Sequence, residues 1–174
     1  AITTGDSNIA IGHGAGDALT TGGSNVAVGH LALSTEDAHG ENVAVGFEAL
    51  KTLNAGADAY NTAVGYKASQ LATTGINNVA FGAFALQSDT TGQRNTALGY
   101  SALYNQNFTD GTQAYNTAVG FNAGAVMQTG SLNTLVGGLS GDAMTTATTN
   151  CALGYLTLSA ETSGQRNTAM GYSA

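Results

Sequence analysis

The sequence predicts an all-β fold, a parallel β-solenoid of ten coils with about 17 residues in each. Three observations predict it: a short motif that recurs along the 174-residue chain, a nearly constant spacing between its copies, and the absence of proline. A period this short suits one solenoid coil per repeat and lies below the 33 or more residues of helical-pair repeats. Proline is not expected where every coil must offer its backbone N–H groups to the next coil.

An asparagine opens each copy of the motif. "NTALGYSA" at 95–102, for example, returns as "NTAMGYSA" at 167–174. Seven of the nine intervals between consecutive asparagines are identical in length, and only the intervals Asn42–Asn61 and Asn95–Asn116 are longer. We therefore expect a single solenoid domain over residues 1–174, with coils that start near Asn8, Asn25, Asn42, Asn61, Asn78, Asn95, Asn116, Asn133, Asn150 and Asn167.

The four residues after each asparagine predict a short strand. The first is Ile, Val, Thr or Cys, the second is Ala in nine coils, the third is a large apolar residue and the fourth is always Gly. Alternation of this kind is typical of a strand. A period this short leaves no room for a helix with its connections, so we expect two short strands and two turns in each coil. The large third residues are expected to form an apolar spine inside the coil.

Stacking would place the same residue of successive coils about 4.8 Å apart. The asparagines of residues 8–167 are then expected to form a structural ladder of side-chain amides, each bonded to the next. The glycines of the fourth position are expected at a turn or at a close approach of a second strand or a neighbouring subunit. These glycines are Gly12, Gly29, Gly46, Gly65, Gly82, Gly99, Gly120, Gly137, Gly154 and Gly171.

Turns and loops account for the rest of each coil. "TTG" precedes the asparagine at 20–22, 73–75 and 90–92, and we expect its glycine to take a positive φ. The two longer coils carry their extra residues in "TLNAGADAY" and "YNQNFTDGTQAY", which we expect to bulge from the same corner, because a loop can lengthen without disturbing the stack. Asn107 opens a sequon for N-glycosylation within the second of these loops.

The charge balance argues against several partners. Four Lys and Arg residues face eleven acids, which gives a net charge of −7. Nucleic acid and anionic membrane surfaces both require clustered basic residues, so neither is an expected partner. No apolar run approaches the ~18–20 residues of a membrane span. Cys151 is the single cysteine, which excludes an intrachain disulfide, and we expect it to be a small core residue.

The sequence predicts no catalytic, cofactor or metal site, and hence no enzyme. Catalysis needs polar groups that converge, and here they do not recur together. His13 and His30 lie five residues after an asparagine, where other coils carry Phe or Tyr, and are expected to join an aromatic column. His39 and the pair Glu36 and Asp37 are expected to form a solvated corner. The Asp residues share no fixed position, unlike those of calcium-binding repeat rolls.

The aromatic column leaves two interpretations open. Its rings can pack over the turn or across subunits, or they can stack on sugars, since an aromatic side chain combines an apolar face with a polar edge. The candidate ligand surface comprises Tyr66, Tyr100, Phe121 and Tyr155. Ice binding is a more distant alternative, because it would need a regular Thr-x-Thr face and the alternate position here is apolar.

The coils also resemble a known family. "NVAVGHLAL", "NTAVGYKAS" and "NTALGYSAL" are similar to the head-domain coils of trimeric autotransporter adhesins of the YadA type and to the "NTAVGYNAL" repeats of phage tail fibres. The resemblance covers all ten coils and implies a left-handed parallel β-roll in which three chains pack side by side. It departs from the adhesin pattern in coil length, since YadA-type coils are shorter than those of this chain, and no neck, stalk or anchor sequence is present.

These observations together predict a structural module of an extracellular fibre on a cell surface, in a secreted filament or in a virion tail. The alternative is a module that binds a glycan or receptor through exposed aromatic residues and the insertion loops. The chain begins at Ala1 rather than at Met. We expect it to be a segment of a longer fibre or to stack end to end, because the terminal coils carry unpaired strand edges.

Overall fold

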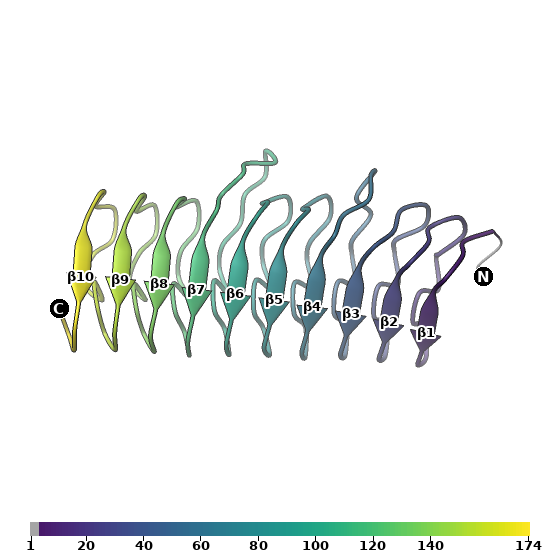
Figure 1. The fold of residues 1–174 in the computed structure, drawn as a ribbon, viewed down its shortest axis with the longest axis horizontal. Helices are drawn as coiled ribbons and strands as arrows, with labels where there is room; N and C mark the ends of the chain where they lie inside the picture. Colours follow the sequence, from purple (N-terminus) through teal and green to yellow (C-terminus); the bar gives the residue numbers. More distant parts are fainter. Residues whose placement is uncertain (1–3) are drawn as a thin grey trace.

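The computed structural model describes residues 4–174 and confirms the predicted β-solenoid (Figure 1). Ten parallel strands form one sheet in sequence order, and Ala1 lies outside the described residues. No helix within residues 4–174 is long and apolar enough to cross a membrane. The strands are β1 (Ile9–Ile11), β2 (Val26–Val28), β3 (Val43–Val45), β4 (Thr62–Val64), β5 (Val79–Phe81), β6 (Thr96–Leu98), β7 (Thr117–Val119), β8 (Thr134–Val136), β9 (Cys151–Leu153) and β10 (Thr168–Met170).

The register of the sheet is constant from end to end. Ala27 pairs with Ala44 across an interval of regular length, and Ala44 pairs with Ala63 across the first lengthened interval. Figure 1 shows the loop between β3 and β4 and the larger loop between β6 and β7 rising from the same side of the solenoid. The extra residues therefore leave the coil in loops, as expected, and do not shift the stack.

The second strand that we expected in each coil is absent from the described residues. Each coil has one three-residue strand, and only the bridges Gln93–Gln113 and Thr148–Gln165 lie outside it. Left-handed residues interrupt the rest of the coil, as at Leu31 (φ 53°) and Leu33 (φ 49°). Their N–H groups still bond to a neighbouring coil, so the coils stack without a second regular strand.

The inner and outer sides of the strand are also the reverse of our expectation. The second residue of the strand faces inward, and Ala27, Ala44 and Ala97 are fully buried. The large third residue faces outward, as at Leu98, which is 43% exposed. The thin coil leaves space for a methyl group beneath the strand, and the core is completed by leucines from the turns, such as Leu50.

Two columns of glycine are required for different reasons. Gly99 has a φ of 137°, and a Cβ added to it would lie 2.5 Å from the carbonyl oxygen of Gly120 in the next coil. Gly22, in the "TTG" turn, does not have the positive φ that we expected. A Cβ on Gly22 would instead overlap the carbonyl oxygen of His39, and the left-handed residue of this turn is Ser24 (φ 58°).

Candidate functional site

The asparagines form an unbroken ladder along the solenoid. The Oδ1 atom of each accepts a hydrogen bond from the backbone N–H of the next asparagine, over 2.9–3.1 Å at all nine steps. The amide nitrogen of Asn78 donates to the carbonyl oxygen of Gly92 at 2.8 Å, and Asn61 donates to Gly75 in the same way. In most coils the ladder thus ties the strand to the turn that follows it along the chain. Its polar atoms are engaged within the chain, so it offers little to a ligand.

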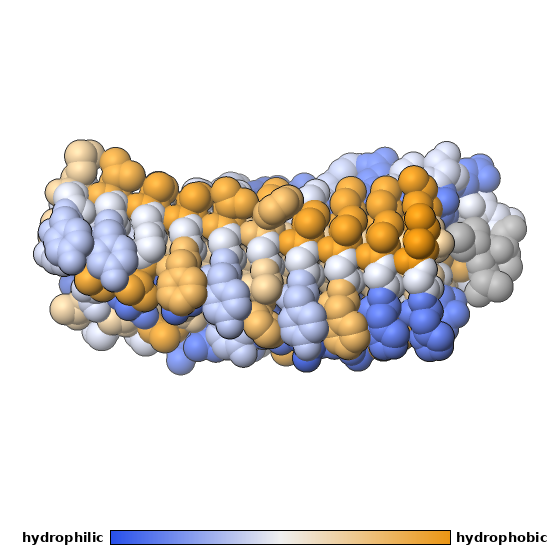
Figure 2. All heavy atoms as spheres, turned by 90° about the horizontal axis from the view of Figure 1, so that it is seen from below, coloured by the Kyte–Doolittle hydropathy of each residue, from blue (hydrophilic) through white to orange (hydrophobic). Residues whose placement is uncertain are grey.

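The outward side chains of the ten strands form a continuous surface, here called the strand face. Figure 2 shows these side chains as an apolar band along the solenoid. Its first-position residues are Ile, Val, Thr or Cys, and no charged residue occurs at the first or third position of any strand. Its third-position residues are Ile11, Val28, Val45, Val64, Phe81, Leu98, Val119, Val136, Leu153 and Met170.

Cys151 belongs to the strand face, and our prediction that it is a core residue was wrong. It is the first residue of β9, and its thiol is free and exposed. The error follows from the reversed strand, because every first-position side chain points away from the coil.

An aromatic column runs beside the strand face, past the carboxyl ends of the strands (Figure 2). His13, His30, Phe47 and Tyr66 stack with ring centroids 5.0–5.4 Å apart and ring planes within 12° of parallel. Tyr100 stacks on Phe121, and Tyr155 on Tyr172, each at 5.5 Å. The four candidate ligand residues are about half exposed: Tyr66 (45%), Tyr100 (49%), Phe121 (55%) and Tyr155 (44%).

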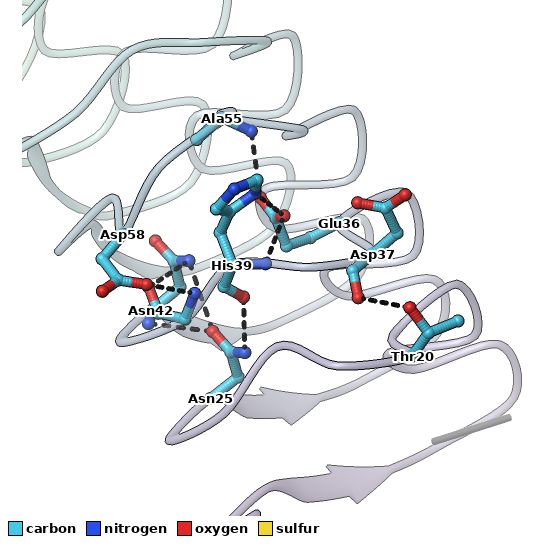
Figure 3. A network of polar contacts seen from close by, with 9 residues as sticks. Thr20, Asn25, Glu36, Asp37, His39, Asn42, Ala55 and Asp58 are labelled. Atoms are coloured by element: carbon cyan, nitrogen blue, oxygen red, sulfur yellow. Dashed lines mark hydrogen bonds and ion pairs between the residues drawn. The ribbon is translucent and has the colours of Figure 1, made fainter. Parts of the chain in front are cut away.

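Glu36 is fully buried, which corrects our expectation of a solvated corner for this residue, whereas Asp37 beside it is exposed as expected and His39 is partly exposed. Figure 3 shows the Glu36 carboxylate held between two segments of backbone. Its Oε1 accepts from the His39 N–H at 3.1 Å and lies 3.3 Å from His39 Nδ1, while its Oε2 accepts from the Ala55 N–H at 3.1 Å. Asp37 could complete a group of three ligand atoms within 4.8 Å of one another. Both Glu36 oxygens already accept hydrogen bonds from the chain. The role of this cluster is therefore to stabilise the fold and not to supply ligand atoms.

Asp89 occupies the corresponding place beside the second insertion loop. Its Oδ1 accepts from the N–H groups of Gly92 and Phe108, each at 3.0 Å, and its Oδ2 accepts from the side chain of Gln106 at 2.6 Å. Burial raises the pKa of Asp89, although these hydrogen bonds act in the opposite direction. The sequence analysis predicted neither the burial of these two acids nor their contacts with the loops. Each stands six residues before an asparagine, in the coil before a lengthened one, and that spacing was the available signal.

The second insertion loop offers a shallow polar depression. Asn107 of the sequon is exposed, and its side-chain oxygen accepts from the Thr90 hydroxyl at 2.9 Å. The ring of Phe108 is buried, at 5% exposure, so the loop presents no aromatic face. The depression is lined by Asn107, Phe108, Thr109, Asp110, Thr112, Thr129 and Ser131.

Comparison with protein-family models, with curated proteins and with solved structures gave no match to this chain. The solenoid architecture therefore rests on the structure itself. Two surfaces present outward-facing side chains along the solenoid, the strand face and the aromatic column.

Proposed function

We propose that this chain is a structural module of an extracellular fibre, and that it associates with further copies of itself through the strand face. The observation that carries the proposal is the outward-facing apolar third position in all ten strands, which is exposed in five of them and only half-buried in the other five. The resemblance of the coils to adhesin and tail-fibre repeats supports the same role and favours a homotrimer.

The size of the strand face suits association. Ten rungs at about 4.8 Å and a strand of three residues give a band of about 45 by 10 Å, or roughly 450 Å². A stable interface buries about 800 Å² on each partner. Exposed side chains at the amino ends of the strands can supply much of the remainder, and they include Tyr60 (54%), Tyr115 (49%) and Leu132 (54%).

Charge also favours contact between copies at this face. The chain carries a net charge of −7, yet none of that charge lies at the outward positions of the strands. Two strand faces can therefore meet without like-charge repulsion at the contact, while the acids elsewhere keep the assembly soluble.

Native mass spectrometry tests the proposal directly. We expect the wild-type chain to form a trimer, and we expect Leu98→Asp to shift it toward monomer while the far-ultraviolet circular dichroism stays unchanged. The matched control is Thr146→Asp in the exposed turn before Asn150, which should leave the trimer intact. A monomeric wild-type chain at tens of micromolar, or a Leu98→Asp variant as trimeric as the control, would overturn the proposal.

A further inference from the structure

Asparagine has two distinct uses in this chain. Ten of the fifteen asparagines open a coil, and the residue two positions after each of them is Ala or Leu. Asn107 is the only asparagine that is followed two positions later by Ser or Thr, and the residue between them, Phe108, is not proline. The single sequon for N-glycosylation in the chain therefore falls in the longer of the two insertion loops.

The structure exposes both side chains that define the sequon. Asn107 and Thr109 are exposed, whereas the ring of Phe108 between them is buried. The N–H group of Asn107 donates to the carbonyl oxygen of Gln128 at 2.9 Å, and that of Phe108 donates to Asp89 at 3.0 Å. The sequon is thus fixed to the stack by its backbone, while its two polar side chains face solvent.

The side-chain amide of Asn107 is engaged through its oxygen only. Its Oδ1 accepts from the Thr90 hydroxyl at 2.9 Å, but its Nδ2 donates no hydrogen bond within residues 4–174. The ladder asparagines differ, since Nδ2 of Asn116 donates to Gly130 at 2.6 Å and to Gln106 at 2.8 Å. An N-glycosidic bond uses Nδ2, so a sugar on Asn107 would break no hydrogen bond of the fold.

The surroundings of Asn107 are polar. The shallow depression beside the second insertion loop adjoins it, and so does another depression, lined by Asn105, Gln128 and Thr129. Amides and hydroxyls both donate and accept hydrogen bonds, as the hydroxyls of a sugar do. Asp110 is the only charged residue that lines either depression. A neutral sugar attached to Asn107 can therefore lie against this surface.

The loop lies away from the aromatic column. Figure 1 shows the loop between β6 and β7 rising beyond the amino ends of the strands, on the side from which the arrowheads point away. The aromatic column runs past the carboxyl ends, beside the strand face (Figure 2). Asn107 bonds to Thr90 and Gln128, which lie in turns of the coils on either side and not in a strand. A glycan on Asn107 therefore leaves the strand face open to further copies.

We propose that Asn107 carries an N-linked oligosaccharide. The proposal rests on the extracellular location of the proposed fibre module, because the transfer takes place in a secretory compartment, but it does not rest on self-association. The donor is an oligosaccharide linked to a lipid diphosphate. The bond between its anomeric carbon and the diphosphate oxygen breaks, and the diphosphate departs with the electron pair. Nδ2 of Asn107 bonds to that carbon and loses one proton to a base of the transferase.

The test is expression of the full chain behind a cleavable secretion signal in cultured animal cells, with the mass of the total chain from cells and medium as the readout. We expect one oligosaccharide per chain, located at Asn107 by peptide mapping and removed by the amidase that converts a glycosylated asparagine to aspartate. Thr109→Ser keeps the sequon and should be modified, whereas Thr109→Ala should not. An unmodified wild-type chain, or modification of Thr109→Ala at Asn107, would overturn the proposal.

Asn107→Thr is the matched control for access by the transferase. It moves the sequon by two residues to Asn105, which is also exposed. Modification of this variant beside an unmodified wild type would show that the transferase reaches the loop and rejects Asn107.

A second measurement tests the placement of the sugar. The glycosylated chain and the amidase-treated chain should have the same oligomeric state and melting temperatures within about 2 °C of each other, and a fall of more than about 5 °C on glycosylation would overturn the proposal. Leu98→Asp, which removes the contact between strand faces, should be modified as fully as the wild type. A glycosylated monomer would thus refute self-association alone, and an unmodified trimer would refute the modification alone.

Discussion

Regular coils and the coils beside an insertion differ at one buried position, eleven residues after the asparagine. In most regular coils this position holds an apolar side chain, as at Leu19, Met127 and Met144, each fully buried, and the exception is Glu161, which is only partly buried. In the coil before each lengthened coil it holds an acid, Glu36 or Asp89, which is also buried.

The difference shows what an insertion requires. The longer loops turn the N–H groups of Ala55 and Phe108 toward these carboxylates. A buried N–H group without an acceptor costs about 1–3 kcal/mol, and each carboxylate supplies the acceptor. An insertion in this solenoid is therefore a loop together with a buried acid in the coil before it.

The largest expected effect concerns the glycine that follows each strand, which both kinds of coil share. Gly99→Val, in a lengthened coil, and Gly137→Val, in a regular one, should each lower the free energy of unfolding by roughly 2–4 kcal/mol, because both residues have a φ near 136° and touch the next coil. Urea denaturation measures both variants. An unchanged stability of Gly99→Val would contradict the stacked-coil model, and a much smaller loss at Gly99 than at Gly137 would show that lengthened coils adapt.

The second prediction tests the buried acid that distinguishes a coil before an insertion from a regular coil. Asp89→Leu should destabilise the chain by about 2–3 kcal/mol, because it leaves the N–H groups of Gly92 and Phe108 without their acceptor. Met127→Leu, at the same position of a regular coil, should cost less than about 1.5 kcal/mol. Thermal or urea unfolding of the pair gives the answer, and equal losses would refute a role for the acid in holding the loop.

The third prediction separates the loop tip from its anchor. Deletion of Thr109 and Asp110, which are exposed, should change the free energy of unfolding by less than about 1 kcal/mol, since the closure entropy of a loop varies slowly with its length. Deletion of Asn107 and Phe108 should cost more, because it removes the N–H group that Asp89 holds. Equal tolerance of the two deletions would show that the anchor is dispensable.

The smallest expected effect is on pH dependence. Burial raises the pKa of Asp89 above its ordinary value of 3.8, so its favourable contribution is complete below pH 3.8 and is lost as the pH rises through the folded-state value. The stability of the wild type relative to Asp89→Asn should therefore fall between pH 3.8 and neutrality.

Glu161 stands at the same position of a later coil and should behave in the opposite way. The N–H groups of Gly164 and Ser163 lower the pKa of Glu161 below its ordinary 4.5, so its contribution is present above pH 4.5 and is lost as the pH falls. Urea denaturation at several pH values, with Glu161→Gln as the second variant, compares the two acids. If the free energy of unfolding changed with pH in the same direction for both acids, the opposite pKa shifts of Asp89 and Glu161 would be contradicted.

Much of the architecture was predictable because the stack repeats the same contacts. The spacing of the asparagines indicated the number of coils, the strand positions and the location of both loops, since an in-register stack needs identical residues at each rung. The stacking of His13 and His30 with Phe47 also followed from their shared position.

The sequence by itself thus determined the period, the register and the columns, because these depend on recurrence along the chain. The tertiary structure decided which side of each strand faces inward. Ala and Val are both apolar, so alternation could not distinguish the two sides, and the narrow coil placed Ala97 inside and Leu98 outside. It also decided the role of Glu36 and Asp89, because the N–H groups that they bind come in part from the neighbouring coil and no pattern within one coil records them.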